Sequence, residues 1–204
     1  MSLSTYSDLK TSVANYLART DLTDQIPDFI GLAERRMRRE VRIRQMLSST
    51  ELTATSGNNK VTLPADFLEA RDFVVVGNPT QPLNYVSPSA LSRNAVSSTS
   101  GKPTEYTILA NQFQLSPAPD FAYTLNLLYY VSPDFLSDEN TSNVFLANVP
   151  DMLLYATLIE AEPYLMNDAR LPTWVSMYER ASASVDKSNE TGQYSGVPLS
   201  IKAV

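Results

Sequence analysis

The chain has 204 residues, of which 43% are hydrophobic and 19% charged, and its net charge is −6. This balance is ordinary for a folded protein, and the length suffices for one core or for a core with a smaller insert. There is no cysteine and no histidine, which excludes disulfides, thiolate nucleophiles, Cys or His metal ligands and a Ser-His-Asp triad.

Two helices are predicted at the start of the chain. Residues 4–19 place apolar side chains at helical spacing, with Ser4 or Thr5 as the N-cap. A second helix is predicted over residues 26–46, where Pro27 fits the first turn. One stripe of this helix is expected to face the core: Ile26, Ile30, Ala33, Met37 and Val41.

The pattern then changes to short β-rich runs. Residues 51–63 place two such runs on either side of Ser56–Asn59, which predicts a hairpin. Residues 72–86 predict a strand, a turn and a second strand. Residues 92–103 are small and polar, which predicts a mobile loop.

Two further β segments follow. Residues 105–119 predict a hairpin that turns at Ala110 and Asn111, and residues 121–131 predict the clearest strand. Its alternate apolar side chains are expected to share one face: Phe121, Tyr123, Leu125, Leu127, Tyr129 and Val131. We interpret this face as core, because a stacking platform for bases would need basic surroundings that the segment lacks.

Helical spacing returns towards the C-terminal end. Asp151–Leu165 predicts a helix that Pro163 should bend or end. Pro172 is expected to open a last helix that runs to about Lys187. Residues 189–204 are interpreted as an extended arm.

The order of these segments predicts an α+β protein, a helical bundle with an inserted β-rich module and an extended C-terminal arm. Such an insert is usually self-contained because it buries its own core. The predicted parts are residues 1–46 for the N-terminal helices, 47–132 for the module, 133–188 for the C-terminal helices and 189–204 for the arm.

Positive charge is concentrated on the second predicted helix. Residues 25–46 hold six arginines against three carboxylates, a net of +3, so the rest of the chain sums to −9. The six are Arg35, Arg36, Arg38, Arg39, Arg42 and Arg44. No Lys or Arg occurs between Lys102 and Arg170, a segment with nine Asp and Glu. A ring of identical subunits would place the basic helix of one copy against the acidic part of the next.

The arginine cluster admits three interpretations. It is a solvated face with the local pairs Glu34–Arg38 and Glu40–Arg44, a protein–protein interface, or a nucleic-acid-binding surface. Lys is scarce, no reader motif occurs and the chain is acidic, which argues against nucleic acid. We favour an interface with a partner or a neighbouring subunit.

No catalytic constellation emerges. The carboxylate pairs Asp138–Glu139 and Glu160/Glu162 lack the setting for acid–base work, and no Gly-rich phosphate loop occurs. We therefore expect no enzymatic activity, no cofactor and no metal.

Residues 1–10 lack the apolar core of a signal peptide, and no run approaches the roughly 20 apolar residues that span a bilayer, so a soluble protein is expected.

The apolar residues of the arm are oddly placed for a solvated tail: Val197, Leu199, Ile201 and Val204. Fraying is one interpretation. Docking on a partner, by strand addition or by filling a groove, is the alternative.

The order of segments resembles a known family. The pieces that carry the likeness are residues 6–17, Ile26-Pro27, the helix with Leu32, Ala33, Glu34, Arg38 and Arg39, and residues 63–75, 101–120 and 151–168. Together they are similar to the head–tail adaptors of tailed phages, the connector or tail tubular proteins of short-tailed, podovirus-type phages (tail tubular protein A-like). No single motif is diagnostic, because these proteins have no catalytic signature.

The resemblance implies a structural virion protein that forms a ring, usually dodecameric, beneath the portal. The implied partners are the portal protein, the tail nozzle or hub protein, copies of the chain itself, and genomic DNA that passes through the lumen without sequence-specific binding. The implied location is the virion neck, with host cytoplasm during assembly. A nucleic-acid-binding protein that uses the arginine-rich helix 26–46 is the alternative function.

Overall fold

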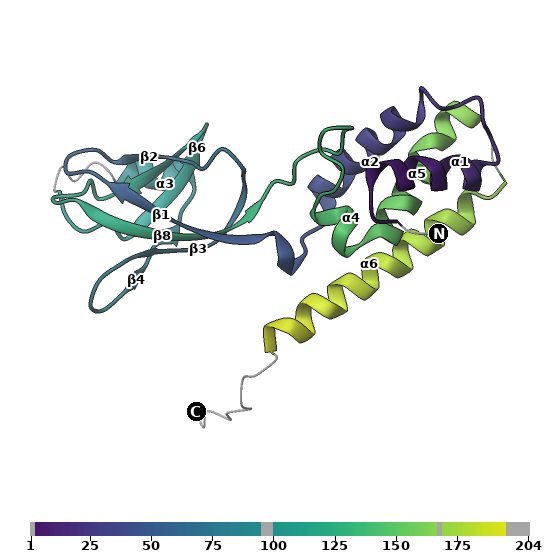
Figure 1. Cartoon of the computed structure of the whole chain (residues 1–204). Helices are drawn as coiled ribbons and strands as arrows, with labels where there is room; N and C mark the ends of the chain where they lie inside the picture. The colour runs from purple at the N-terminus through teal and green to yellow at the C-terminus, as the bar shows by residue number, and fades with distance from the viewer. Residues whose placement is uncertain (1–2, 95–99, 167–168, 195–204) are drawn as a thin grey trace. The chain divides into compact units, whose positions relative to one another are not determined.

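The computed structural model describes residues 3–94, 100–166 and 169–194, and the chain divides into two compact units (Figure 1). The helical unit comprises Met1–Met46 and Pro133–Val204, and the β unit comprises Leu47–Ser132. Five of the described α-helices belong to the first unit and all eight described strands to the second. Helices and sheets thus occupy separate segments, which confirms the predicted α+β class.

The first two helices begin where their caps predict. Helix α1 (Tyr6–Leu17) starts after Thr5, whose side chain accepts from the backbone N of Asp8 while the Asp8 carboxylate accepts from the backbone N of Thr5. This capping box satisfies two backbone donors that a helix start would leave open. Helix α2 (Ile26–Glu40) carries Pro27 in its first turn, where the missing N–H costs nothing.

Helix α2 ends six residues before the predicted end at residue 46, so the prediction of one helix over 26–46 is wrong there. Val41 adopts an extended conformation, and a short 3-10 turn, η1 (Arg44–Met46), follows. Val41 and Ile43 are both buried, 6% and 2% exposed. Val41 and Ile43 are two positions apart, so both can face the core only where the backbone is extended. Both are also β-branched, which favours the extended conformation over a continued helix.

Three helices complete the helical unit: α4 (Val144–Asn148), α5 (Pro150–Leu165) and α6 (Leu171–Tyr194). Helix α5 ends two residues after Pro163. Helix α6 continues past Lys187, so the predicted end of this helix is wrong and residues 189–194 of the predicted arm are helical. The proposed docking residues of the arm, Val197, Leu199, Ile201 and Val204, lie outside the described residues.

The β unit consists of two four-stranded sheets. The first has the order β1 (Leu47–Ala54), β8 (Tyr123–Val131), β3 (Phe67–Val75), β4 (Gln81–Pro82). The second has the order β2 (Lys60–Thr62), β7 (Gln112–Ser116), β6 (Glu105–Leu109), β5 (Asn84–Tyr85). All neighbours are antiparallel except β5 and β6.

The predicted hairpin over residues 51–63 is wrong. Strand β1 pairs with β8, and β2 pairs with β7 in the other sheet. The intervening loop crosses between the sheets, and its Gly57 has a φ of 74° and donates to the carbonyl of Pro119 at 2.8 Å. Ala54 and Val61 enter the same core from opposite sheets. Burial of Ala54 and Val61 in this core stabilises the chain more than hydrogen bonding between β1 and β2 in a local hairpin would.

Three other β predictions have clear outcomes. The hairpin over 105–119 is confirmed, with Leu109 opposite Gln112. Residues 72–86 form a strand, a turn and a strand, as predicted. Strand β8 begins only at Tyr123, two residues later than predicted. Phe121 is 69% exposed, so the assignment of Phe121 to the core face is wrong.

The predicted loop 92–103 overlaps a short helix, α3 (Pro88–Asn94), and then lies partly outside the described residues.

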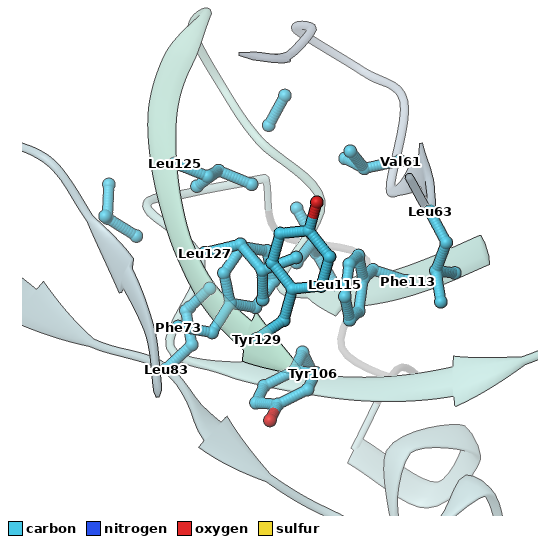
Figure 2. Packing of buried hydrophobic residues seen from close by; sticks show 12 residues of the cluster. Val61, Leu63, Phe73, Leu83, Tyr106, Phe113, Leu115, Leu125, Leu127 and Tyr129 are labelled. Carbon is cyan, nitrogen blue, oxygen red and sulfur yellow. The ribbon is translucent and has the colours of Figure 1, made fainter. Parts of the chain in front are cut away.

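Aromatic side chains join the two sheets into one core (Figure 2). The ring centroids of Phe73 from β3 and Phe113 from β7 are 4.6 Å apart, and those of Phe73 and Tyr106 from β6 are 5.1 Å apart. Leu125, Leu127 and Tyr129 add the inner face of β8. Such pairs stabilise beyond their buried area, so the β unit has a core of its own.

Candidate interaction surface on the arginine-rich helix

Glu34 is the buried charged residue of α2, with only 1% of its surface exposed. Its Oε1 accepts hydrogen bonds from the backbone N of Leu136 at 3.0 Å and from Nδ2 of Asn143 at 2.7 Å. Burial raises the pKa of Glu34, and these two donors offset part of the rise. Because Asn143 also caps α4, the carboxylate fastens the connecting residues 134–143 to α2.

Phe135, in this connecting segment, lies against two guanidinium groups of α2. Those of Arg35 and Arg38 are 5.1 Å and 4.6 Å from the centre of its ring, distances at which a cation and a ring face attract. Phe135 remains 37% exposed, and Leu32 on the adjacent turn of α2 is 47% exposed. The surface therefore presents apolar groups flanked by two cations.

A groove of about 630 Å³ lies beside this ring, between α1, α2 and residues 135–139. Leu32 and Phe135 contribute apolar walls. Lys10 of α1 and Asp138 meet at its rim in an ion pair of 2.8 Å. Of the carboxylate pair Asp138–Glu139, Asp138 thus takes part in this ion pair, and Glu139 accepts from the hydroxyl of Ser137 at 3.0 Å.

Arg36 points into a polar network instead of outwards. Its Nε is 3.2 Å from Glu40 and its Nη1 is 3.4 Å from Glu160 on α5. Tyr178 on α6 lies under the guanidinium and donates to Glu40 at 3.1 Å. Burial and this hydrogen bond raise the pKa of Tyr178 to about 12. Arg36 therefore links three helices, and Glu40 pairs with Arg36 and Tyr178 rather than with Arg44, its partner in the solvated-face interpretation.

Arg42 and Arg44 follow α2 and lie against its end and against α6. Nη1 of Arg42 donates to the carbonyls of Arg38 and Val41, both at 2.9 Å, and so caps the end of α2. Asn189 on α6 donates from Nδ2 to the carbonyl of Arg42 at 2.6 Å and accepts from the backbone N of Arg44 at 3.1 Å. One amide side chain thereby holds the chain turn after α2.

The six arginines thus occupy different places in the helical unit: Arg35 and Arg38 beside Phe135, Arg36 in the network, Arg42 and Arg44 at the turn, and Arg39 exposed near the end of α2. Over the described parts of the chain, no three His, Cys, Asp or Glu side chains gather as a potential metal site. The helices that the structure describes include none long and apolar enough to cross a membrane.

Comparison with known protein families gives a match over residues 4–201 to the family described as SU10 adaptor protein. The chain belongs to this family of phage head–tail adaptors. The adaptor is accordingly a structural protein of the virion, and its family implies contacts with other head and tail proteins and with copies of itself. This confirms the resemblance drawn from the order of segments. A search of curated proteins found no match.

Sequence reasoning missed three residues that organise this part of the adaptor: Glu34, Asn143 and Asn189. For Glu34 a signal existed, because it follows the buried Ile30 by four positions and precedes the buried Met37 by three. A carboxylate at that spacing lies at the margin of the apolar stripe. For Asn143 the local signal is that of an N-cap, while its bond to Glu34 spans 109 positions. Asn189 carries no local signal, since its partners lie far away along the chain.

Proposed function

We propose that the adaptor assembles as a dodecameric ring that joins the portal to the tail nozzle and extends the DNA channel. Assembly would take place in the host cytoplasm, and the ring would occupy the neck of the virion. Genomic DNA would pass through the lumen without sequence-specific binding. The ring, its two partners and the channel go beyond family membership.

The segregation of charge carries this proposal. A basic segment, residues 25–46, of net +3 and a remainder of −9 on one chain are complementary between copies in a head-to-tail ring. Acidic groups at the lumen would repel packaged DNA and let it slide, which suits a conduit better than a binder.

The arginines are proposed to serve the contact to the portal or to a neighbouring subunit in two ways. Arg35 and Arg38 provide cations beside the exposed ring of Phe135, and Arg39 adds an exposed cation near the end of α2. Arginine and aromatic side chains are enriched at the centres of interfaces. The other three, Arg36, Arg42 and Arg44, hold the helix and its end in place behind this surface. The arm residues Val197, Leu199, Ile201 and Val204 would dock on a partner.

Mixing the adaptor with the portal protein of the same phage tests the proposal. The free adaptor is expected to be a monomer, because surplus negative charge repels free subunits and surface ion pairs are individually weak. The portal would hold subunits side by side and raise their effective concentration. Native mass measurement should then show a portal-bound ring. Retention on DNA at moderate salt without portal binding would favour the nucleic-acid alternative instead.

Two variants test the surface itself. Replacing Arg35 and Arg39 by Gln should weaken incorporation into the portal complex while the helical unit stays folded, because both side chains are exposed. Arg180→Gln, on the exposed side of α6, is the matched control and should assemble normally. Unchanged incorporation of the double variant at physiological salt would show that these arginines form only a solvated face.

A further inference from the structure

Strand β1 is a long edge strand. It pairs with β8 on one side, and no other described strand pairs with it. It has eight residues, whereas the edge strands β2, β4 and β5 have three, two and two. Short edges are one way in which proteins prevent pairing with other chains. β1 has no such protection, since it contains no proline or lysine and only one charged residue, Glu51.

The inner side of β1 is incompletely covered. Ser48, Thr50 and Leu52 lie opposite Tyr129, Leu127 and Leu125 of β8. Those three β8 residues are buried, whereas the three of β1 are only half-buried. A further strand beside β1 with apolar side chains on this face would complete the cover over the core.

We propose that residues 197–203 of a second copy of the chain add to β1 as a strand, an inference that rests on the proposed head-to-tail ring. Val197, Leu199, Ile201 and Ala203 alternate with Pro198, Ser200 and Lys202, the period of a strand with one apolar face. Seven residues match the length of the eight-residue edge. The apolar set faces the core side of β1.

The charges of Glu51 and Lys202 favour the same orientation of the added segment, with its apolar residues towards the core. Glu51 points to the outer face of β1 and is exposed. Lys202 lies on the polar face of the added segment, so the one charge of the donor and the one charge of the acceptor share a face with opposite signs. Opposite charges on neighbouring strands stabilise pairing, and like charges oppose it.

Pro198 determines which backbone groups bond to β1. Successive residues of a strand point their N–H and C=O groups to alternate sides, and a proline on an edge must turn its missing donor away from the partner strand. Leu199 and Ile201 therefore bond to β1, whereas Ser200 and Lys202 face away from it. With the apolar set on the core side, the segment must run parallel to β1. Val76 of β3 donates to the carbonyl of Thr124, so Leu125, Leu127 and Tyr129 direct their backbone groups to the core-side residues of β1, and an antiparallel segment would place its bonding residues on the outer face. This parity is specific to strand addition, because filling a groove does not distinguish the two sets of amides.

Three synthetic peptides of residues 195–204 test the proposal on the isotopically labelled full chain. The unmodified peptide should shift the amide resonances of β1. Methylation of the Ser200 nitrogen, which faces away, should change the affinity by less than about twofold, whereas methylation of the Ile201 nitrogen should weaken binding by about tenfold or more. The side chains are identical, so the two methylated peptides are matched.

Charge reversal provides a second readout. Glu51→Lys in the chain should weaken binding of the unmodified peptide by about three- to tenfold, and a peptide with Lys202→Glu should recover most of the lost affinity. Asp72→Lys is the control, because Asp72 lies on β3 away from the edge. This variant should bind the unmodified peptide with the affinity of the unchanged chain.

Absence of binding, shifts outside β1, or equal effects of the two methyl groups would overturn the proposal. So would protection, in dilute protein without peptide, of the β1 amides that do not bond to β8, because the chain's own segment would then occupy the edge. Portal binding by the full chain is measured separately, so failure here leaves the adaptor function standing.

Discussion

Removal of the buried carboxylate of Glu34 should destabilise the helical unit strongly. Glu34→Ala deletes the hydrogen bonds to the backbone N of Leu136 and to Asn143. A hydrogen bond to a charged group contributes about 1.5–3 kcal/mol, and an unpaired buried donor costs a similar amount. Nδ2 of Asn143 keeps its bond to the carbonyl of Asp134, so we expect a loss of about 3–5 kcal/mol rather than more.

The single tryptophan makes the measurement specific. Trp174 is 4% exposed and belongs to the helical unit, so its fluorescence in denaturant follows that unit without a contribution from the β unit. Glu139→Ala is the matched control, because this exposed carboxylate bonds only to the side chain of Ser137 among the described contacts. Its effect should stay within about 0.5 kcal/mol.

The pH dependence gives an independent test of the same residue. Burial raises the pKa of Glu34 in the folded chain, so the folded state holds this proton more tightly than the unfolded state. The corresponding stability is present below the unfolded pKa and is lost as pH rises through the raised folded pKa. Glu34→Gln should lack this loss. A cost of less than about 1 kcal/mol for Glu34→Ala, or an unchanged pH dependence in the Gln variant, would show that Glu34 does not have this role.

Three further changes test neighbouring contacts. Asn189→Ala removes both bonds to the turn after α2 and should cost about 1–3 kcal/mol in denaturant unfolding. Gly192→Ala should raise the melting temperature slightly, because Ala favours the helix and the Arg44 guanidinium that its Cβ would meet ends a flexible side chain that can move aside. Tyr178 stays protonated to a pKa of about 12, so its stabilisation is lost as pH rises through that value. Tyr178→Phe should therefore show a shallower alkaline loss of fluorescence-monitored stability.

Local patterns were sufficient for most helices. Capping by Thr5, the position of Pro27 and the apolar spacing of α5 depend on residues within a few positions of one another. The hairpin at Ala110 was predictable for the same reason, because a tight turn joins its two strands. Such features carry their signal within a short window of sequence.

The secondary-structure predictions were wrong where contacts between residues far apart along the chain determine the structure. Residues 51–63 contain a local turn signal, yet β1 pairs with β8, more than sixty residues further along the chain. In the extension of α6, Asn189 bonds to the backbone groups of Arg42 and Arg44. A local propensity is weak beside the burial and hydrogen bonding that such contacts provide.

The sequence by itself determined the α+β class, the adaptor family and the concentration of arginine in one segment, because composition, periodicity and segment order are properties of the chain alone. Only the tertiary structure decided what each arginine contacts. Arg36 meets Glu160, more than a hundred residues away, whereas Arg38 meets Phe135. Contacts between distant residues follow from how the helices pack against one another, and no spacing along the chain encodes that packing directly.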